Sequence, residues 1–405
     1  MTWLDAAAAI TVFDVLVCIA VVLPFTQLAR HRRAIPLLPD SAAGVRLPSL
    51  SVVLAARDEA PHVERSLRSL LAQDYPELEI IAVDDRSRDG TPAVLSGVAK
   101  SDTRVVVLRV HELPAGWLGK NHALWRGAER ARGEWLLFTD ADVVFATGAL
   151  RRALSYAVAH ELDHLTLAPL LVARSLPLRA FVAYFAYAFI ALWGAYRAND
   201  RRSGRGVGIG AFNLVRRSAY EAVGTMRAIS LRPDDDIRLG RRLRAFGFRQ
   251  RMLNGRAVLS VAWYPSLGAA VSGLEKSMYP SVEYRVVDAL IVVAFIVATM
   301  VWPFIGVALL GGVDRVLLAT AVVCLWLGVA ETYRQALGDL LDLRAVVAIV
   351  LFPFSAAVFA YTVVRSMFLA ETVGLTWRGT VYPLSLLRTQ SGLEGVPPAT
   401  MGRAW

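Results

Sequence analysis

Residues 135–142 read WLLFTDAD, an apolar run of strand length that ends in two carboxylates one residue apart. Burying two neighbouring negative charges is costly, so packing alone does not explain Asp140 and Asp142. At the end of a strand, however, both carboxylates can reach one divalent cation, because Mg²⁺ shares its oxygen ligands between one or two carboxylates and substrate phosphates. A solvated turn is the simpler interpretation of the same triplet. The surrounding sequence has to decide between the two.

This run belongs to a series of apolar runs that alternate with plausible helices. The runs lie at 50–56, 79–83, 104–108 and 134–139, and the intervening helices at 60–72, 91–99 and 121–132. The alternation predicts an α/β fold with a mostly parallel sheet and helices on both faces. Ligands of such a sheet bind outside the carboxyl ends of its strands. Polar clusters follow three of the runs at that position: Arg57-Asp58-Glu59, Asp84-Asp85 and Asp140-Ala141-Asp142.

Long apolar segments lie at both ends of the chain, whose hydrophobic fraction is 56% and whose mean hydropathy is +0.46. Since about twenty apolar residues span a bilayer, we expect one transmembrane helix within residues 1–30 and about three within residues 286–370. Residues 48–284 then form a globular domain, and residues 371–405 form a tail. The alternative for the apolar segments is a set of buried core helices in a large soluble protein.

Charges next to the first apolar segment predict its orientation. Its leader is acidic rather than basic, and no small-residue cleavage site precedes Arg30, so we expect a retained span and not a secretory signal peptide. Positive charge follows the segment at Arg30, His31, Arg32 and Arg33. The positive-inside rule therefore places the N-terminus outside and residues 48–284 in the cytoplasm.

The net charge of +10 arises from 41 arginines and only 3 lysines, set against 34 acidic residues. A basic face suits anionic lipid headgroups or substrates that carry phosphate. A basic rim that only fixes membrane topology is the alternative, and nucleic acid is a poorer partner because no recognised binding motif accompanies the charge. Cys18 and Cys324 both lie in apolar segments, which excludes a disulfide framework.

Residues 178–196 form an apolar, aromatic segment inside the expected globular domain, flanked by Arg179 and Arg197. A membrane span at this position would put the two halves of the domain on opposite sides of the bilayer. We therefore expect an interfacial helix whose aromatic rings lie at headgroup depth. A glycine-rich stretch at 204–210 follows it.

Five motifs, in a fixed order, resemble those of the family 2 glycosyltransferases. They are SVVLAARDE at 51–59, VDDRSRDGT at 83–91, TDAD at 139–142, GIGAFNLVRR at 208–217 and DDIRLGRRL at 235–243. The resemblance covers about residues 48–264. It implies the GT-A fold, which is Rossmann-like, a bound Mg²⁺ or Mn²⁺ ion, a nucleotide-diphosphate sugar as donor, with a UDP-sugar favoured, and an inverting mechanism. The stretch 116–120, GWLGK, resembles one in bacterial lipid-directed members, including hopanoid- and carotenoid-associated ones.

The resemblance also implies roles for single residues. Asp140 and Asp142 would hold the metal, and the residues that contact the nucleotide sugar would be Arg57, Asp58, Glu59, Asp84, Asp85, Lys120 and Asp140. Three alternatives stay open. Asp58 or Glu59 could cap the following helix, Asp89-Gly90-Thr91 fits a turn and a helix cap better than a ligand, and Lys120 could be an ordinary surface lysine.

Inversion needs a general base that removes a proton from the acceptor hydroxyl. Family members carry an acidic pair before a helix that contains Leu-Gly, and the matching pair here is Asp235-Asp236, with Asp234 adjoining. By this resemblance Asp236 is the base and Asp235 its supporting partner. Three successive carboxylates should repel one another and raise the pKa of at least one of them. Complementing the dipole at a helix N-terminus is the alternative role.

We therefore expect a multi-pass glycosyltransferase of the bacterial inner membrane, with a cytoplasmic catalytic domain and a membrane lipid hydroxyl as acceptor. A processive polysaccharide synthase is one alternative, although its Gln/Arg-x-x-Arg-Trp signature is absent. A catalytically silent membrane scaffold is another. Three C-terminal spans would put the tail outside, whereas Arg378, Arg388 and Arg403 suggest a cytoplasmic tail. Either a re-entrant segment or a hairpin would resolve that conflict.

Overall fold

The computed structural model describes residues 3–30, 35–40, 46–338 and 343–390. His31, Arg32, Arg33 and Arg403, which carry part of the orientation argument, lie outside these residues. The chain divides into two compact units. A helical unit comprises Met1–Ala34, Leu171–Tyr196 and Trp263–Leu375, and a sheet unit comprises Ile35–Leu170, Arg197–Ala262 and Thr376–Trp405. Residues 178–196 and 263–284 thus group with the helices, and residues 376–390 group with the sheet.

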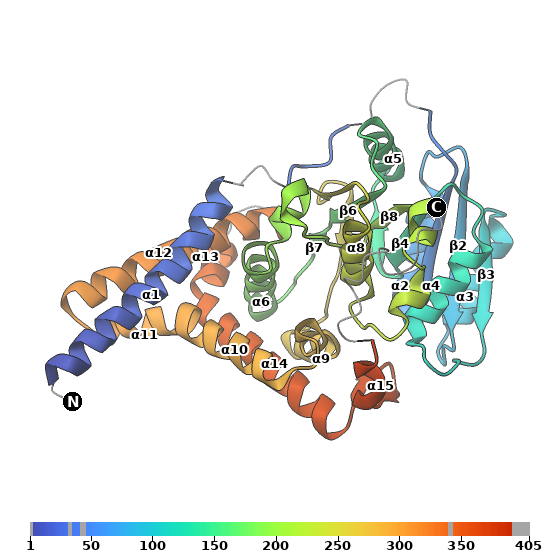
Figure 1. Cartoon of the computed structure of the whole chain (residues 1–405). Helices are drawn as coiled ribbons and strands as arrows, with labels where there is room; N and C mark the ends of the chain where they lie inside the picture. The colour runs from blue at the N-terminus through green and yellow to red at the C-terminus, as the bar shows by residue number, and fades with distance from the viewer. Residues whose placement is uncertain (1–2, 31–34, 41–45, 339–342, 391–405) are drawn as a thin grey trace. The chain divides into compact units, whose positions relative to one another are not determined.

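The sheet unit is built on a seven-stranded sheet with the order β3-β2-β1-β4-β8-β6-β9 (Figure 1). Strand β1 pairs in parallel with β2 and β4, and β2 pairs in parallel with β3, which confirms the predicted parallel sheet. Strand β8 runs antiparallel to both of its neighbours. The strands are β1 Leu50–Ala56, β2 Leu78–Asp85, β3 Val105–Val110, β4 Trp135–Asp140, β6 His164–Ala168, β8 Asn213–Arg216 and β9 Gln250–Asn254.

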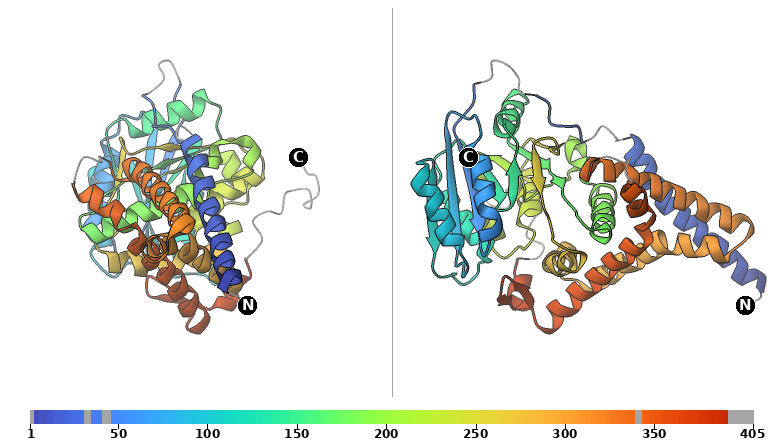
Figure 2. Two further views of the ribbon diagram at one scale, coloured as in Figure 1. Left: turned by 90° about the vertical axis from the view of Figure 1, so that its left-hand side faces the viewer. Right: turned by 180° about the vertical axis from the view of Figure 1, so that it is seen from behind.

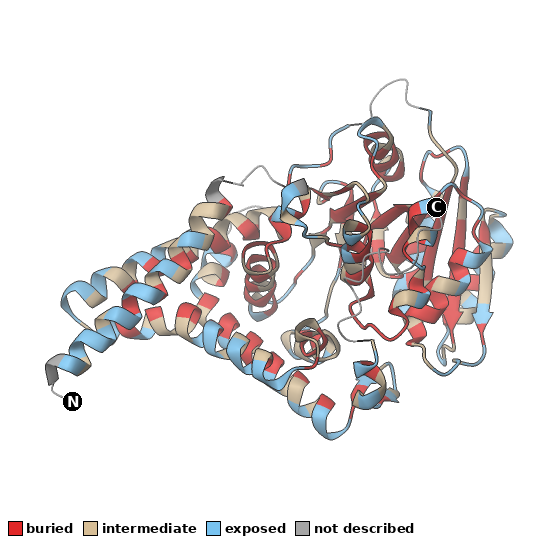
Figure 3. Ribbon diagram, in the orientation of Figure 1, coloured by how far each residue is buried: buried red, intermediate tan, exposed pale blue. Residues whose placement is uncertain are grey.

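Helices cover both faces of this sheet, which is why its central strands β1 and β4 are mostly apolar. Val53 of β1 packs in a core with Leu124 of α4. Its neighbours Val52 and Leu54 point to the opposite face and are equally buried. The central strands of the sheet are drawn mostly in the colour of buried residues (Figure 3). The helices of the unit are α2 Ala60–Leu71, α3 Thr91–Ser101, α4 Gly119–Arg130, α5 Ala149–Ala159, α7 Arg217–Ala222, α8 Asp235–Ala245 and α15 Leu384–Arg388.

Short strands complete the architecture. Strands β5 Val143–Phe145, β10 Leu259–Val261 and β7 Leu170–Leu171 form a three-stranded sheet. Near the C-terminus β11 Leu375–Trp377 pairs with β12 Thr380–Tyr382.

The helical unit contains four stretches that are long and apolar enough to cross a membrane, by length and composition (Figure 2). They are Asp5–Leu28, Val286–Leu309, Gly312–Ala336 and Phe352–Thr372, in agreement with the expected one plus about three. Their apolar side chains are widely exposed: Leu16, Ile291 and Leu327 are each more than half accessible. Such exposure argues against the alternative of buried core helices in a soluble protein.

The elements of the helical unit are α1 Trp3–Arg30, α6 Leu176–Tyr187, α9 Leu267–Met278, α10 Val286–Ile296, α11 Trp302–Leu309, α12 Gly312–Ala336, α13 Leu343–Val350 and α14 Phe352–Thr372. The apolar sequence at 345–370, within the expected C-terminal spans, is not one helix. It breaks at Leu351, between α13 and α14, and Pro353 occupies the first turn of α14, a position where proline is well tolerated.

The aromatic segment expected to lie at the membrane interface forms α6 and a π-helical continuation, Ala188–Leu192. Phe181, Tyr184 and Tyr187 are buried inside the helical unit, where α6 contacts α12, α13 and α14. These rings therefore have a packing role. An interfacial position for the segment stays a prediction.

Candidate active site

The register of the sheet brings the three predicted strand ends level with one another. Ala56 of β1 pairs with Asp84 of β2, and Ala55 pairs with Asp140 of β4. Because the three strands are parallel, the residues that follow them emerge at the same edge of the sheet. The polar clusters predicted from the sequence are therefore neighbours in space.

Arginines surround the carboxylates at the end of β2. Asp84 and Asp85 are both buried. Arg109 Nε donates to Asp84 Oδ2 at 3.3 Å, and Arg86 Nε donates to Asp85 Oδ1 at 2.8 Å. Arg57 Nη1 lies 3.9 Å from Asp85 Oδ2, while Arg57 Nε is buried without a hydrogen-bond partner among the described residues. An unsatisfied buried donor is costly, so Arg57 is suited to bind an acceptor atom of a ligand.

The turn after β1 is tied to the turn after β2. Asp58 adopts a left-handed conformation with φ 54°, which aspartate tolerates better than most residues. Its backbone N–H donates to Ser87 Oγ at 3.1 Å, and its Oδ1 accepts from Arg88 N at 2.7 Å. The two turns thus form one polar surface.

Helix capping does not use Asp58 or Glu59. Helix α2 has Glu59 at its N-cap position, yet the Glu59 side chain makes no capping bond. Instead, Asp89 accepts from Ala60 N at 3.1 Å and from Thr91 N at 2.9 Å. Asp89 is therefore the turn and cap residue, as its Asp-Gly-Thr context indicates.

Asp140 lies at the end of β4, where its backbone N–H donates to Gly210 O at 3.1 Å. Asp142, two residues on, is half-buried, and burial raises its pKa to about 7, assisted by the nearby charges of Asp140 and Glu59. Two neighbouring carboxylates repel each other when both are ionised, and a cation bound between them relieves that repulsion.

The carboxylates of Asp140 and Asp142 are the oxygen ligands available here for a metal ion. Within the described part of the chain, no three His, Cys, Asp or Glu side chains converge as a metal site. Two carboxylates, Asp140 and Asp142, are enough for Mg²⁺ or Mn²⁺ only if a substrate supplies the remaining oxygens, which is the usual arrangement for Mg²⁺ with phosphates. The donor set fits a metal that arrives with a diphosphate.

Lys120 joins the end of β4 to the start of α8. Its Nζ lies 3.0 Å from Asp140 Oδ1 and 3.3 Å from Asp235 Oδ1, and its side chain is only 23% exposed. Burial by itself lowers the pKa of Lys120, but the charges of Asp140, Asp235 and Asp236 outweigh it and raise that pKa. Lys120 is thus held as an ammonium among carboxylates, which argues against the surface-lysine alternative.

The three successive aspartates at 234–236 have separate surroundings. Asp234 is buried between two guanidinium groups, with Arg232 Nε at 3.1 Å and Arg238 Nε at 2.6 Å. Burial alone would raise the pKa of Asp234, but these two arginines outweigh it and lower that pKa. Asp234 makes no side-chain capping bond to α8. Its role in this structure is an ion pair.

Asp236 faces the glycine-rich loop instead. Its Oδ2 accepts from Gly210 N at 2.6 Å, and its Oδ1 accepts from Ile237 N at 2.8 Å. Burial and the neighbouring charge of Asp235 raise the pKa of Asp236 to about 7. A carboxylate with such a pKa can take up a proton at neutral pH.

Two glycines let the loop approach these carboxylates. A Cβ on Gly210 would lie 2.6 Å from Asp140 Oδ2 and 3.4 Å from Asp236 Oδ2. A Cβ on Gly208 would lie 1.9 Å from the carbonyl oxygen of Asp236. Both glycines belong to the motif GIGAFNLVRR at 208–217, but the sequence analysis assigns them no role, so Gly208 and Gly210 were missed as site residues.

Asn121 was also missed. Its Nδ2 donates to Ile229 O at 2.7 Å and to Arg232 O at 2.9 Å. These bonds fix the segment before Asp234 against the helix that carries Lys120. Its position directly after Lys120 in the sequence was the one indication that Asn121 belongs to the site.

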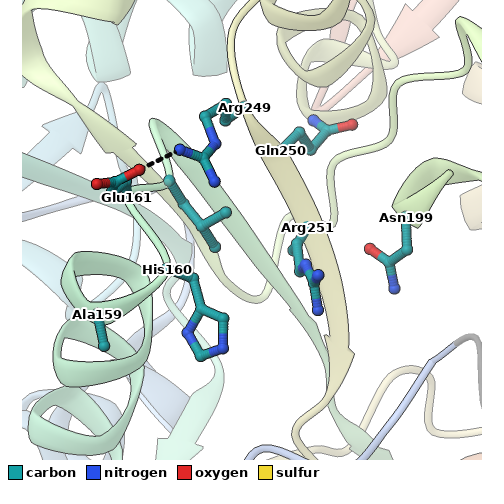
Figure 4. A pocket seen from close by; sticks show the side chains of 8 residues that line it. Ala159, His160, Glu161, Asn199, Arg249, Gln250 and Arg251 are labelled. Atoms are coloured by element: carbon teal, nitrogen blue, oxygen red, sulfur yellow. Dashed lines mark hydrogen bonds and ion pairs between the residues drawn. The ribbon is translucent and has the colours of Figure 1, made fainter. Parts of the chain in front are cut away.

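A polar pocket of about 300 Å³ lies elsewhere in the sheet unit, at the end of α5 and the start of β9 (Figure 4). Its polar groups bond within the protein: Arg249 pairs with Glu161, and both ends of the Asn199 amide bond the backbone of Met252. None of the predicted site residues lines this pocket.

Comparisons with known proteins identify the family that part of this chain matches and the fold that it shares. Residues 51–224 match the family model for glycosyl transferase family 2. A putative teichuronic acid biosynthesis glycosyltransferase of Bacillus subtilis is 32% identical over 109 residues, which cover 27% of this chain and 42% of that protein. The 4,4'-diaponeurosporenoate glycosyltransferase of Staphylococcus aureus is 34% identical over 97 residues, 24% of each chain. The chain thus spans less than half the length of these relatives.

A solved structure shares the fold. A mannosyltransferase from Pyrobaculum calidifontis, in complex with GDP-Man and Mn²⁺, superposes with a TM-score of 0.52 at 17% sequence identity, covering 89% of this chain and 98% of that one. The parallel sheet, its acidic strand ends and the family match lead to one conclusion. Residues 51–224 form a family 2 glycosyltransferase domain with the GT-A fold.

Proposed function

We propose that this chain is a membrane-bound, metal-dependent, inverting glycosyltransferase that moves a sugar from a nucleotide-diphosphate sugar to a hydroxyl group of a membrane lipid. One observation carries the proposal. The carboxylates of Asp140 and Asp235 share the ammonium of Lys120, and Asp140 and Asp236 flank Gly210, at the edge of the sheet where ligands of parallel sheets bind.

The nucleoside part of the donor belongs at the ends of β1 and β2. Buried carboxylates such as Asp84 and Asp85 accept hydrogen bonds from ribose hydroxyls and from a ring N–H. Arg57, Asp58 and Glu59 supply the adjoining turn. Because uracil carries such an N–H, a UDP-sugar is the first donor to test.

The diphosphate belongs between the end of β4 and the N-terminus of α4. Asp140 and Asp142 would hold Mg²⁺ or Mn²⁺, which when bound neutralises charge on the departing nucleoside diphosphate. Lys120 keeps a compact positive charge beside Asp140, and an ammonium is a common phosphate contact.

Asp236 is the proposed general base, with Asp235 as its supporting partner. The acceptor oxygen forms a bond to the anomeric carbon while the bond to the diphosphate oxygen breaks, and the acceptor proton moves to the Asp236 carboxylate. The electron pair of the broken bond leaves with the nucleoside diphosphate. A base pKa near the working pH favours such a transfer, and the raised pKa of Asp236 supports the assignment.

The proposed acceptor rests on the four apolar stretches of the helical unit. The two relatives do not decide it, since one is named for 4,4'-diaponeurosporenoate and the other for teichuronic acid biosynthesis. Nucleotide sugars are made in the cytosol, so we propose a bacterial inner-membrane protein whose sheet unit is cytoplasmic.

Purified full-length protein tests the function directly. It is incubated with Mg²⁺ or Mn²⁺, a panel of radiolabelled nucleotide sugars and a lipid extract from the inner membrane. We expect label in the organic phase with at least one donor, and none after chelation of the metal. Transfer to water-soluble acceptors alone would refute the lipid acceptor, and a growing polymer would favour a processive synthase.

A further inference from the structure

We propose that residues 376–390, called here the C-terminal segment, form one wall of the donor site and lie on the same side of the membrane as that site. The second half of this proposal is independent of the chemistry, whereas the first rests on the proposed function. The C-terminal segment follows the last apolar helix and belongs to the sheet unit.

A hairpin turn brings the C-terminal segment to the end of β1. Strands β11 and β12 are joined by Arg378 and Gly379, whose φ values of 48° and 73° are both positive. Positive φ at both central residues is typical of the tight turns that join hairpin strands. Arg378 Nη2 forms an ion pair with Glu59 Oε1, one of the residues proposed to contact the donor.

Tyr382, at the end of β12, contacts the helix that carries Lys120. Its side chain is buried, and its hydroxyl oxygen accepts a hydrogen bond from Gly119 N at 3.3 Å. Gly119 begins α4, and the first amides of a helix have no partner within the helix. The N-cap residue, Leu118, supplies no side-chain acceptor. Tyr382 is therefore a positioning residue for the turn of α4 that presents Lys120.

Gln390 contacts the segment that precedes the three successive aspartates at 234–236. Its Oε1 accepts from Leu231 N at 2.8 Å, and its Nε2 donates to Ser230 Oγ at 3.0 Å. Asn121 also donates to backbone carbonyls of this segment, those of Ile229 and Arg232. The C-terminal segment thus touches the turn after β1, the start of α4 and the approach to Asp234.

This position constrains how the chain crosses the membrane. The chain leaves the sheet unit after Ala262 and returns to it at Thr376. If both points lie on one side, the number of crossings between them is even. Three candidate stretches lie between them: Val286–Leu309, Gly312–Ala336 and Phe352–Thr372. One of the three must enter and leave on the same side.

The stretch that contains α14 fits a re-entrant path. Near its end, Arg365 pairs with Glu275 and Glu371 accepts from the Tyr279 hydroxyl. Its uncharged part before Arg365 is about 20 Å long at 1.5 Å per residue, short of the roughly 30 Å hydrocarbon core. The preceding α13 is about 12 Å long by the same measure. Of the three stretches between Ala262 and Thr376, Phe352–Thr372 is the least hydrophobic, so we assign the re-entrant path to α13 and α14 together.

Site-directed labelling tests the side of the membrane without reference to activity. In the full chain, Cys18 and Cys324 are replaced by alanine, and a single cysteine is placed at exposed Ser385 of α15. An impermeant maleimide is applied to sealed right-side-out and inverted vesicles. Ser96→Cys, on exposed α3, is the matched reference for the sheet unit. We expect both cysteines to react from the same face, and reaction of Ser385→Cys from the opposite face would overturn the proposal.

Steady-state kinetics with varied donor concentration test whether the C-terminal segment forms a wall of the donor site. Tyr382→Phe removes the acceptor for Gly119 N, and the loss of one hydrogen bond should raise the donor KM about two- to tenfold. We expect the acceptor KM to stay unchanged and the Tm to fall slightly, because Gly119 N–H loses its partner. Gln390→Ala should act in the same direction, and Ser96→Ala, at an exposed position of α3 outside the C-terminal segment, should change nothing. A fall in Tm with an unchanged donor KM would make the C-terminal segment merely structural and overturn this half.

The two experiments separate failure of the inference from failure of the function. If the unmodified protein neither binds nor uses a nucleotide sugar, the proposed function is wrong. The proposal that the C-terminal segment lines the donor site is then wrong as well. The labelling pattern still decides the side of the membrane in that case.

Discussion

Seven carboxylates in and around the candidate active site fall into two groups that differ in their cationic partners. In an arginine-paired region, Asp84, Asp85 and Asp234 bind guanidinium groups. In a lysine-centred region, Asp140 and Asp235 share the ammonium of Lys120, with Asp236 and Asp142 close by. Planar guanidinium groups fix carboxylates in place, whereas carboxylates that crowd around one ammonium remain able to take up a proton or a metal.

The contrast is sharpest within one short stretch. Asp234 and Asp236 are two residues apart at the start of α8, yet arginines lower the pKa of Asp234, while burial and Asp235 raise that of Asp236 to about 7. The difference teaches that the charge around a carboxylate, more than its residue type, separates a structural aspartate from a chemical one.

The largest effect is expected in the lysine-centred region. Asp236→Asn keeps the size of the side chain but removes the proposed base, so kcat should fall on the order of 10²- to 10⁴-fold. Donor binding and the Tm should be nearly unchanged. Steady-state transfer to lipid gives the measurement, and Asp74→Asn, at a carboxylate whose side chain is 77% exposed, is the control. Wild-type turnover in Asp236→Asn would remove Asp236 from the mechanism.

In the arginine-paired region, a substitution should lower the free energy of unfolding. Asp234→Asn leaves Arg232 and Arg238 buried without their shared carboxylate, which should cost about 3–5 kcal/mol of unfolding free energy. Chemical denaturation of the purified protein, followed by circular dichroism, gives the value. A variant as stable as the wild type would mean that the buried ion pairs contribute little.

Much of this architecture could be predicted from the sequence. Apolar runs of strand length predicted the parallel sheet, and the acidic residues that follow them marked its binding edge. The features that the sequence did not predict depend on tertiary contacts. Nothing in a run of three aspartates reveals that Asp234 meets two arginines, because that depends on where Arg232 and Arg238 point in the fold. Likewise, Arg378 lies 319 residues from Glu59 along the chain, beyond the reach of any local pattern.

A smaller effect is expected at the proposed metal ligands. Asp142→Asn should weaken the apparent affinity for Mn²⁺ on the order of a hundredfold, since it removes one of two protein carboxylates. Activity should return in part at high Mn²⁺ concentration. Titration of transfer activity with the metal tests this expectation. An unchanged metal dependence would assign the ion to other ligands.

The smallest effect concerns pH. The carboxylate of Asp236 acts as a base only when it is deprotonated, so its raised pKa places the loss of activity on the acid side. Turnover should fall as the pH drops through about 7. A pH profile of kcat under saturating donor and metal measures the effect. A profile that stays flat down to pH of about 5, where an ordinary aspartate is still ionised, would contradict the raised pKa.

The comparison of the two aspartates is tested most directly by measuring both quantities on both variants. Turnover and unfolding free energy are determined for Asp234→Asn and Asp236→Asn in the full-length protein. We predict that Asp236→Asn loses turnover and keeps its stability, while Asp234→Asn loses stability. Loss of the same quantity in both variants, or stable and active protein in both, would contradict the division into a structural and a chemical carboxylate.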